Sequence, residues 1–204
     1  MGNEKIKNVK ISCKGFVTCR SDFYTAHTTV NGTQFEFKEG INIISCEIDD
    51  ECWGICYILS LYNVFKNDFT LYESTVKING NDISLDEFGK YSCYMDKTYP
   101  MFNSKKSVRA LVKQGLKTSG LDFSDEDIRR LFKIDEERFD RQIMQTGNER
   151  FKAMTAIGYV FGKTVFCFPW LSKKRFDGFH LNLSELPDIL ESLGKIVIFP
   201  IGKI

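Results

Sequence analysis

Residues 41–59 place a short apolar run, an acidic loop and a longer apolar segment in an order that could hold a phosphate. The run 41–45 is rich in isoleucine, which favours a buried β-strand. Asp49, Asp50 and Glu51 can begin a helix, because carboxylates stabilise its positive end. A strand that leads into a helix through a tight loop is a common phosphate-binding position in α/β proteins.

The residues in this loop lack the groups that phosphate chemistry needs. The phosphate loop of nucleoside triphosphatases reads G-x-x-x-x-G-K-[ST], where the lysine reaches the phosphates and the hydroxyl holds magnesium. Gly54 keeps the second glycine of this pattern, whereas Ile55 replaces the lysine and Cys56 replaces the hydroxyl residue. We interpret Gly54, Ile55 and Cys56 as a vestigial nucleotide-binding position. An ordinary strand–helix junction is the alternative.

Size and composition are those of a globular protein. The 204 residues are 43% apolar and 27% charged, and the formal net charge of +1 gives no overall attraction to nucleic acid or acidic membranes. No apolar run approaches the roughly 20 residues that a membrane span needs. The polar start of the chain shows no signal-peptide pattern. We therefore expect a cytoplasmic protein with no transmembrane segment.

The cysteines and histidines argue against both a disulfide framework and a metal site. Seven cysteines are an odd number, and several lie inside apolar runs, which favours buried free thiols. His27 and His180 lie far apart in the sequence and no C-x-x-C pair is present, so we expect no metal ligands. Cys52 or Cys56 could be a nucleophile at a helix start, but neighbouring acids disfavour the thiolate and no histidine is near as a base.

The remaining pattern changes from β-rich to helical and then to alternating strands and helices. Asn31-Gly32 predicts a hairpin turn between flanking strands, within an antiparallel β-layer at the start of the chain. Strands are expected at 6–12, 33–38, 41–45, 71–78, 83–88, 91–95, 164–168 and 196–200. Helices are expected at 52–65, from Ser104 or Ser107 to 117, from Ser124 to 132, at 150–161 and at 184–193.

This order of elements resembles the ATP-binding cassette (ABC) ATPase domain of ABC transporters. The resemblance implies an α/β fold with a P-loop NTPase-like core, an N-terminal antiparallel β-layer and a helical subdomain. It implies a single domain over residues 1–204, in which 1–100 and 145–204 form the core and 101–144 form the helical subdomain. Phe23 or Tyr24 lies roughly where the family stacks an aromatic ring on adenine.

The best single match to the family is its signature motif, L-S-G-G-Q/E-R. Here Thr146 keeps a hydroxyl, Gly147 is kept, Asn148 replaces the second glycine and Glu149-Arg150 match. The resemblance implies that this segment would bind phosphate at the start of the following helix. A plain helix cap made by Thr146 and Glu149 is the alternative.

The family's catalytic residues are missing. No glutamine lies at 94–97, and no histidine follows the last strand. The family's magnesium-binding aspartate and catalytic glutamate would follow the strand at 164–168, but no Asp or Glu lies between Phe151 and Phe176. The resemblance therefore implies no catalytic residues, no bound metal and no cofactor, and we expect no ATP hydrolysis by this chain alone.

Two functions are left open by these observations. The chain could complete the ATP site of an active ABC partner through Thr146, Gly147 and Asn148, or it could be a scaffold, dimerisation or regulatory domain that no longer binds nucleotide. The implied partners are another ABC ATPase subunit, a second copy in a homodimer, and a membrane permease. Direct nucleic-acid binding is not expected, because acidic runs balance the basic ones.

Overall fold

The computed structural model describes residues 5–13, 15–20, 24–28, 33–45, 69–72, 75–96, 100–169, 171–182 and 185–202. The backbone forms two compact units. Met1–Tyr94 together with Val165–Ile204 make one, which we call the α/β unit, and Met95–Thr164 make the other, which we call the helical unit. Residues 46–68 lie outside the described residues, and with them the predicted helix at 52–65 and Gly54, Ile55 and Cys56. Phe23 lies outside them as well.

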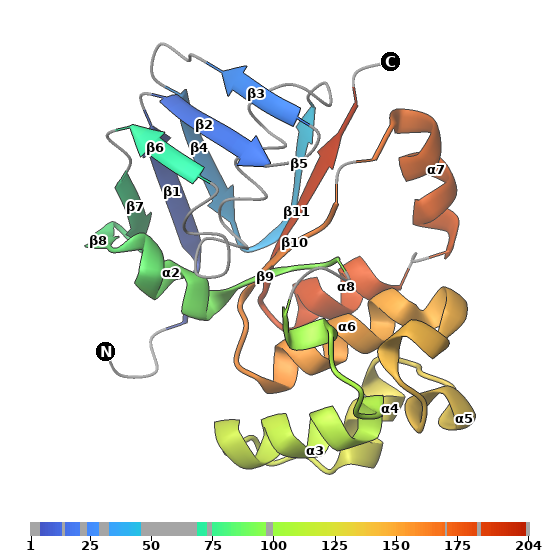
Figure 1. Ribbon diagram of the computed structural model, residues 1–204. Coiled ribbons are helices and arrows are strands. Elements are labelled where there is room, and N and C mark those ends of the chain that lie inside the picture. The colour runs from blue at the N-terminus through green and yellow to red at the C-terminus, as the bar shows by residue number, and fades with distance from the viewer. Residues whose placement is uncertain are drawn as a thin grey trace. The chain divides into compact units, whose positions relative to one another are not determined.

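Antiparallel strands make up the β-layer of the α/β unit, as the sequence predicts (Figure 1). The larger sheet has the order β4-β1-β7-β8, and its inner face buries Val9, Phe37 and Val76. A second sheet has the order β3-β2-β6. The strands are β1 (Asn8–Cys13), β2 (Gly15–Arg20), β3 (Tyr24–Thr28), β4 (Thr33–Lys38), β6 (Phe69–Tyr72), β7 (Thr75–Ile78) and β8 (Asn81–Ile83).

Three local predictions in this layer are wrong. The strands on either side of Asn31-Gly32 do not form a hairpin, because β3 pairs with β2 and β4 pairs with β1. The single strand predicted over 71–78 is two strands, β6 and β7, in different sheets. The segment predicted as a strand from 83 contains helix α2 (Leu85–Tyr91), because the Ser84 hydroxyl accepts a hydrogen bond from Glu87 N at 3.1 Å and caps the helix.

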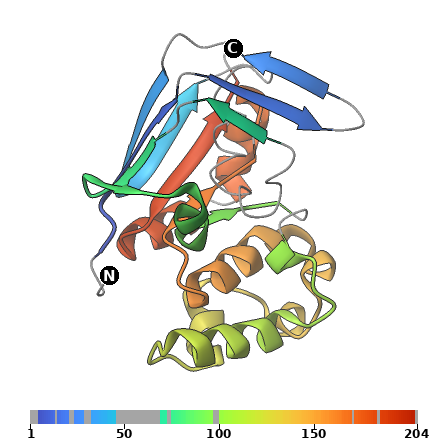
Figure 2. The same ribbon diagram turned by 60° about the vertical axis from the view of Figure 1, so that its left-hand side comes forward.

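A four-stranded parallel sheet forms the core of the α/β unit, in the order β5-β11-β10-β9. Figures 1 and 2 both show β5 and β11 side by side along their length. All residues of β9 and β10 are buried, as expected for strands of a covered parallel sheet. The strands are β5 (Gly40–Ser45), β9 (Ser92–Tyr94), β10 (Val165–Cys167) and β11 (Ile196–Ile201), and the helices that follow β10 are α7 (Lys173–Asn182) and α8 (Leu186–Ser192).

The prediction of a fully buried strand at 41–45 is wrong in one respect. The strand is present as β5, but the exposed fractions of Ile41 and Ile43 are 39% and 54%. Among the described strands β5 lies at the end of the sheet order and pairs with β11 alone, so an isoleucine-rich run does not ensure burial there.

The helical unit is built around α6 (Arg150–Val160), whose residues from Ala153 to Val160 are all buried. In Figure 2, α3 in yellow-green lies along α6 in orange, and α3 packs on α6. This packing explains why the compact unit, 95–164, is longer than the predicted subdomain, 101–144. The other elements are η1 (Pro100–Phe102), α3 (Val108–Ser119), α4 (Asp125–Leu131), α5 (Glu136–Phe139), η2 (Ile143–Gln145) and η3 (Gly147–Glu149).

Local signals set the helix starts in this unit. The Ser107 hydroxyl accepts from Ala110 N and begins α3, and Ser124 with Asp127 forms a reciprocal capping box at α4. Gly120, with φ at 68°, ends α3 in the left-handed conformation that favours glycine. None of the helices in the described part of the chain is long and apolar enough to cross a membrane.

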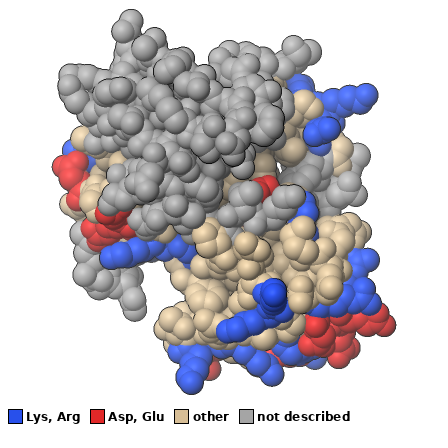
Figure 3. Space-filling model, in the orientation of Figure 1, with Lys and Arg blue, Asp and Glu red and all other residues tan. Residues whose placement is uncertain are grey.

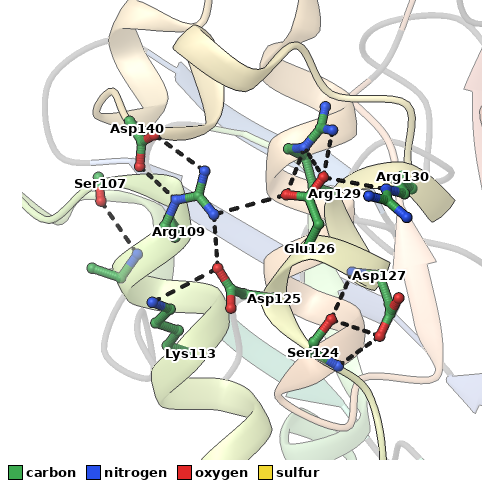
Figure 4. Close-up of polar contacts among 11 residues, drawn as sticks. Ser107, Arg109, Lys113, Ser124, Asp125, Glu126, Asp127, Arg129, Arg130 and Asp140 are labelled. Carbon is green, nitrogen blue, oxygen red and sulfur yellow. Dashed lines mark hydrogen bonds and ion pairs between the residues drawn. The ribbon is translucent and has the colours of Figure 1, made fainter.

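Arg109 joins three helices of this unit, as Figure 4 shows. From α3, its guanidinium donates to Asp140 after α5, with Nε to Oδ1 at 2.6 Å, and to Asp125 at the start of α4, with Nη1 to Oδ2 at 2.8 Å. It also lies 4.8 Å from the centre of the buried Phe139 ring, at a cation–π distance. The chain next to this hub is fixed by a backbone hydrogen bond from Val108 N to Arg141 O.

The charges in this network stabilise one another. The hydrogen bonds that Arg109 donates to Asp140 and Asp125 raise the pKa of Arg109 above its ordinary value. The hydrogen bond from Arg109 in turn holds the pKa of Asp140 below its ordinary value of 3.8. A bond from Arg129 lowers the pKa of Glu126 in the same way. These shifts keep Arg109, Asp140 and Glu126 charged at neutral pH.

The close packing of α3 on α6 requires glycine at position 115. A Cβ atom there would overlap Val160 Cγ2 and lie 3.0 Å from Phe161 Cδ2. We expect Gly115→Ala to lower the free energy of unfolding by about 1 kcal/mol, because overpacking costs about 1–3 kcal/mol and exceeds the gain in helix propensity. Gly178→Ala is the control: no described atom lies within 4 Å of its Cβ position, so it should stabilise α7 by about 0.5–1 kcal/mol. Urea unfolding of both variants measures this, and equal effects would contradict the packing argument.

Acid should weaken the Arg109 hub. Because the folded-state pKa of Asp140 is depressed, its contribution is fully present above about pH 5 and is lost as the pH falls through 3.8 toward the folded-state pKa. We expect Asp140→Asn to lower the free energy of unfolding by about 1 kcal/mol at pH 7 and by less at pH 3. The control is Asp122→Asn, since Asp122 is exposed and outside the hub. Denaturant unfolding at both pH values checks this, and a pH-independent effect of Asp140→Asn would argue against the ion pair.

Candidate functional site

The segment Gln145–Glu149, which we call the signature-like loop, connects η2 to α6. The loop turns on Gly147, whose φ of 60° lies in the left-handed region, and a Cβ there would meet no described atom within 4 Å. Gly147 and Asn148 are exposed, whereas Thr146 is fully buried. The structure therefore brings the four predicted residues together at a helix start but presents only part of the loop to the surface.

The hydroxyl of Thr146 points inward. Its Oγ1 donates to the carbonyl of Ile143 at 2.7 Å. Neither Thr146 nor Glu149 makes a side-chain hydrogen bond that caps the helix it precedes, so the helix-cap alternative is wrong. In this conformation the loop can offer Gly147 and Asn148 to a ligand, but the one hydroxyl of the motif is occupied.

Arg138 on α5 contacts the signature-like loop through a single nitrogen atom, Nη1. Its Nη1 donates to the carbonyl of Thr146 at 3.3 Å and to Oδ1 of Asn148, and it lies 3.9 Å from Oε1 of Glu149. The other carboxylate oxygen of Glu149 accepts from Asp135 N at 3.0 Å. The loop is thus tied to the start of α5 by both charged and backbone groups.

No signal in the sequence pointed to Arg138 or Arg109. Asp135 is recognisable as the N-cap of α5, since its Oδ1 accepts from Arg138 N at 3.2 Å. The contacts of the Arg138 guanidinium, however, reach residues eight and ten positions later, across a turn whose geometry the sequence does not specify. Arg109 likewise pairs with Asp140, which lies 31 positions away.

Acidic and basic side chains are mixed on the helical unit. On the face drawn in Figure 3, blue and red side chains lie next to one another along the lower edge, where Figure 1 places α3 to α5. Several of these charges form ion pairs within the unit, such as Arg141 with Glu137 at 3.3 Å. The described residues on this face therefore form no extended basic stripe of the kind that binds nucleic acid.

The carboxyl end of β10 carries aromatic residues where the resemblance to ABC ATPases implies two acids. Phe168 follows the strand directly, is fully buried and stacks on Phe199 of β11, with ring centres 4.4 Å apart. Phe199 also meets Phe176 of α7 edge-on, with ring centres 5.5 Å apart. Pro169 follows and is half-buried. The residues that the structure describes at this end of the strand form an apolar cluster, and none of them is a carboxylate.

The structure does not describe the side chains at the other predicted nucleotide-binding positions. Tyr24 begins β3, but its side chain lies outside the described residues, as do Gly54, Ile55 and Cys56. Cys93 and Cys167 are buried and are not joined to another described cysteine by a disulfide, in line with the prediction for the cysteines. Within the described ranges, no group of three or more His, Cys, Asp or Glu side chains could hold a metal ion.

Comparison with known proteins identifies the fold. No protein-family model matches the sequence, and no curated protein matches it. Among solved structures, the chain is similar to an ATP-binding subunit of an ABC transporter, with a TM-score of 0.57 and 12% identity over 94% of this chain and 79% of that one. An ABC transporter ATP-binding protein from Pyrococcus furiosus gives a TM-score of 0.58 and 12% identity over 96% of this chain and 92% of that one.

A third similar structure is a bacterial Atm1-family ABC exporter with ATP bound. Its TM-score is 0.59 and its identity is 10%, and the match covers 98% of this chain but 36% of the exporter. All three matches extend over nearly the whole of this chain, including both compact units. The chain has the fold of the ATP-binding domains of ABC transporters.

Proposed function

We propose that this chain is a non-hydrolysing subunit with the ABC ATPase fold that acts through protein contacts. The observation that carries the proposal is the apolar carboxyl end of β10, where the buried Phe168 stacks on Phe199. Phosphoryl transfer needs a magnesium ligand and a group that orients water, acting together with a phosphate-binding lysine. An aromatic cluster can supply neither of the first two, and Ile55 replaces the lysine in the sequence.

The signature-like loop suggests how such a subunit would act. In the family that the chain resembles, two domains enclose ATP between the phosphate loop of one and the signature of the other. Gly147 and Asn148 are exposed at the start of α6, where backbone dipoles favour an anion. We therefore propose that this loop completes the ATP site of an active ABC ATPase subunit in the cytoplasm. A second copy of this chain or a membrane permease could be a further partner.

One observation favours the alternative function, in which the chain is a scaffold, dimerisation or regulatory domain that no longer binds nucleotide. The Thr146 hydroxyl is buried and donates to Ile143 O, so the loop lacks the free hydroxyl that a phosphate contact would use. If this conformation is the working one, the loop would serve only to shape a protein contact. Nucleotide dependence of the association separates the two functions.

We expect the purified chain to show no ATP hydrolysis above background and no tight magnesium-dependent ATP binding. The reason is the joint absence of the lysine, the magnesium ligands and the water-orienting group, each of which is worth orders of magnitude in rate. Calorimetry with ATP and ADP, with and without magnesium, and a phosphate-release assay measure this. Tight magnesium-dependent binding would show that residues 46–68 or another segment form a working nucleotide site.

Association with an ATP-bound, phosphate-loop-containing ABC ATPase subunit should depend on Gly147. We expect Gly147→Asp to weaken this association at least about tenfold, because its carboxylate would face the partner's phosphates and like charges repel strongly in an interface. Gly120→Asp is the matched control, since Gly120 is also left-handed, exposed and without a described neighbour at its Cβ position. Sedimentation of the mixed proteins with ATP, with ADP and without nucleotide measures the effect. Association that ignores both nucleotide and Gly147→Asp would favour the scaffold function.

A further inference from the structure

We infer that Arg138 is the positioning residue of the signature-like loop, and that the loop is pre-formed for its partner because Arg138 holds it. The inference rests on the proposed function for its consequence, since the partner contact is the property that Arg138 would control. Its structural part concerns the conformation of the loop in this chain alone. The two parts can therefore be tested separately.

The first support is the convergence of three loop groups on one atom. Arg138 Nη1 donates to Thr146 O at 3.3 Å and to Asn148 Oδ1, and lies 3.9 Å from Glu149 Oε1. These groups lie on both sides of Gly147, the one loop residue that has no side chain to anchor it. The guanidinium thus bridges the turn from the residue before the glycine to the two residues after it.

The second support is a closed ring of interactions between the loop and the start of α5. Arg138 N donates to Asp135 Oδ1 at 3.2 Å, and Asp135 N donates to Glu149 Oε2 at 3.0 Å. Glu149 Oε1 then faces the guanidinium of Arg138, which completes the ring. Because Glu149 contacts both the backbone of α5 and the cation, the loop cannot shift without breaking both contacts.

The loop needs such a clamp for a physical reason. Gly147 is exposed and left-handed, and glycine has the greatest backbone freedom of any residue. The loop contains the end of one 3₁₀ turn, η2, and the whole of another, η3, and the hydrogen bonds of such turns have poorer geometry than those of an α-helix. A loop that is ordered before binding loses less conformational entropy in the complex, which strengthens and speeds association.

Arg141 is a nearby arginine for comparison, because its side-chain ion pair lies within its own segment and does not reach the signature-like loop. It pairs with Glu137 one helical turn earlier, at 3.3 Å, and 52% of its side chain is exposed. Exposed pairs of this kind contribute little to stability. Arg138 has an exposed fraction of 35% and contacts three residues beyond its own helix. Arg141→Gln is therefore a matched control for Arg138→Gln.

Amide hydrogen exchange of the full chain tests the structural part. We expect Arg138→Gln to speed exchange of the amides from Thr146 to Glu149 at least about tenfold, while α3 and the buried part of α6 keep their protection. Arg138→Lys should restore most of the protection, because all three contacts converge on one nitrogen and an ammonium group provides three donors. Arg141→Gln should leave the loop unchanged. Unchanged loop exchange in Arg138→Gln would overturn the inference, as would equal loss of protection throughout the helical unit.

Association with the ATP-bound ABC ATPase subunit tests the consequence. We expect Arg138→Gln to weaken it at least about fivefold, mainly through slower association, and Arg138→Lys to recover most of the loss. If Gly147→Asp abolishes association but Arg138→Gln leaves it unchanged, the positioning role is wrong and the proposed function stands. Arg138→Gln could speed amide exchange in the loop while neither Arg138→Gln nor Gly147→Asp weakens an association that is observed. In that case Arg138 does position the loop, and the proposed function is wrong.

Discussion

The guanidinium of Arg109 determines how the helical unit is assembled. It meets carboxylates at the start of α4 and at the end of α5 and lies over the buried ring of Phe139, so one side chain of α3 fixes two further helices. Asp125 has an exposed fraction of only 21%, which makes its ion pair with Arg109 stronger than one on a fully solvated surface, whereas Asp140 is 55% exposed and its pair is more strongly screened. A backbone hydrogen bond from Val108 N to Arg141 O fixes the chain next to this hub, and the signature-like loop begins a few residues after Arg141. The position of the loop therefore depends on the hub.

The α/β unit depends on a different constraint, which is the burial of its parallel sheet by apolar side chains. The strands β9, β10 and β11 are covered on both faces, and a strand in that setting must be apolar along its length. In this chain the apolar character continues past the carboxyl end of β10 into Phe168, which packs on Phe199. The end of a parallel strand is where α/β folds usually place their polar functional groups. Here the described residues at that place, Phe168 and Phe199, are buried and stack on one another.

The contrast between the two units underlies the proposed function. In the α/β unit, aromatic side chains pack at the carboxyl end of β10, and in the helical unit an exposed turn is held by charged contacts. Arg138 and Asp135 anchor this exposed glycine turn to the start of α5. The proposed role in recognition would make use of the anchoring, because ordered loops bind with a smaller loss of entropy.

The sequence alone determined much of the element order and the fold class. Capping serines at 107 and 124, the glycine at 120 and the apolar strand runs at 165–167 and 196–201 act over a few residues, so their effects can be read locally. The same local signals misled where pairing partners are distant: Asn31-Gly32 predicts a hairpin that β3 and β4 do not make, and the isoleucines of β5 are not all buried. Only the tertiary structure decided that Thr146 turns inward and that Arg109 and Arg138 hold the helical unit and its loop. Those contacts depend on where turns direct side chains many positions apart, and no local pattern of residues specifies that.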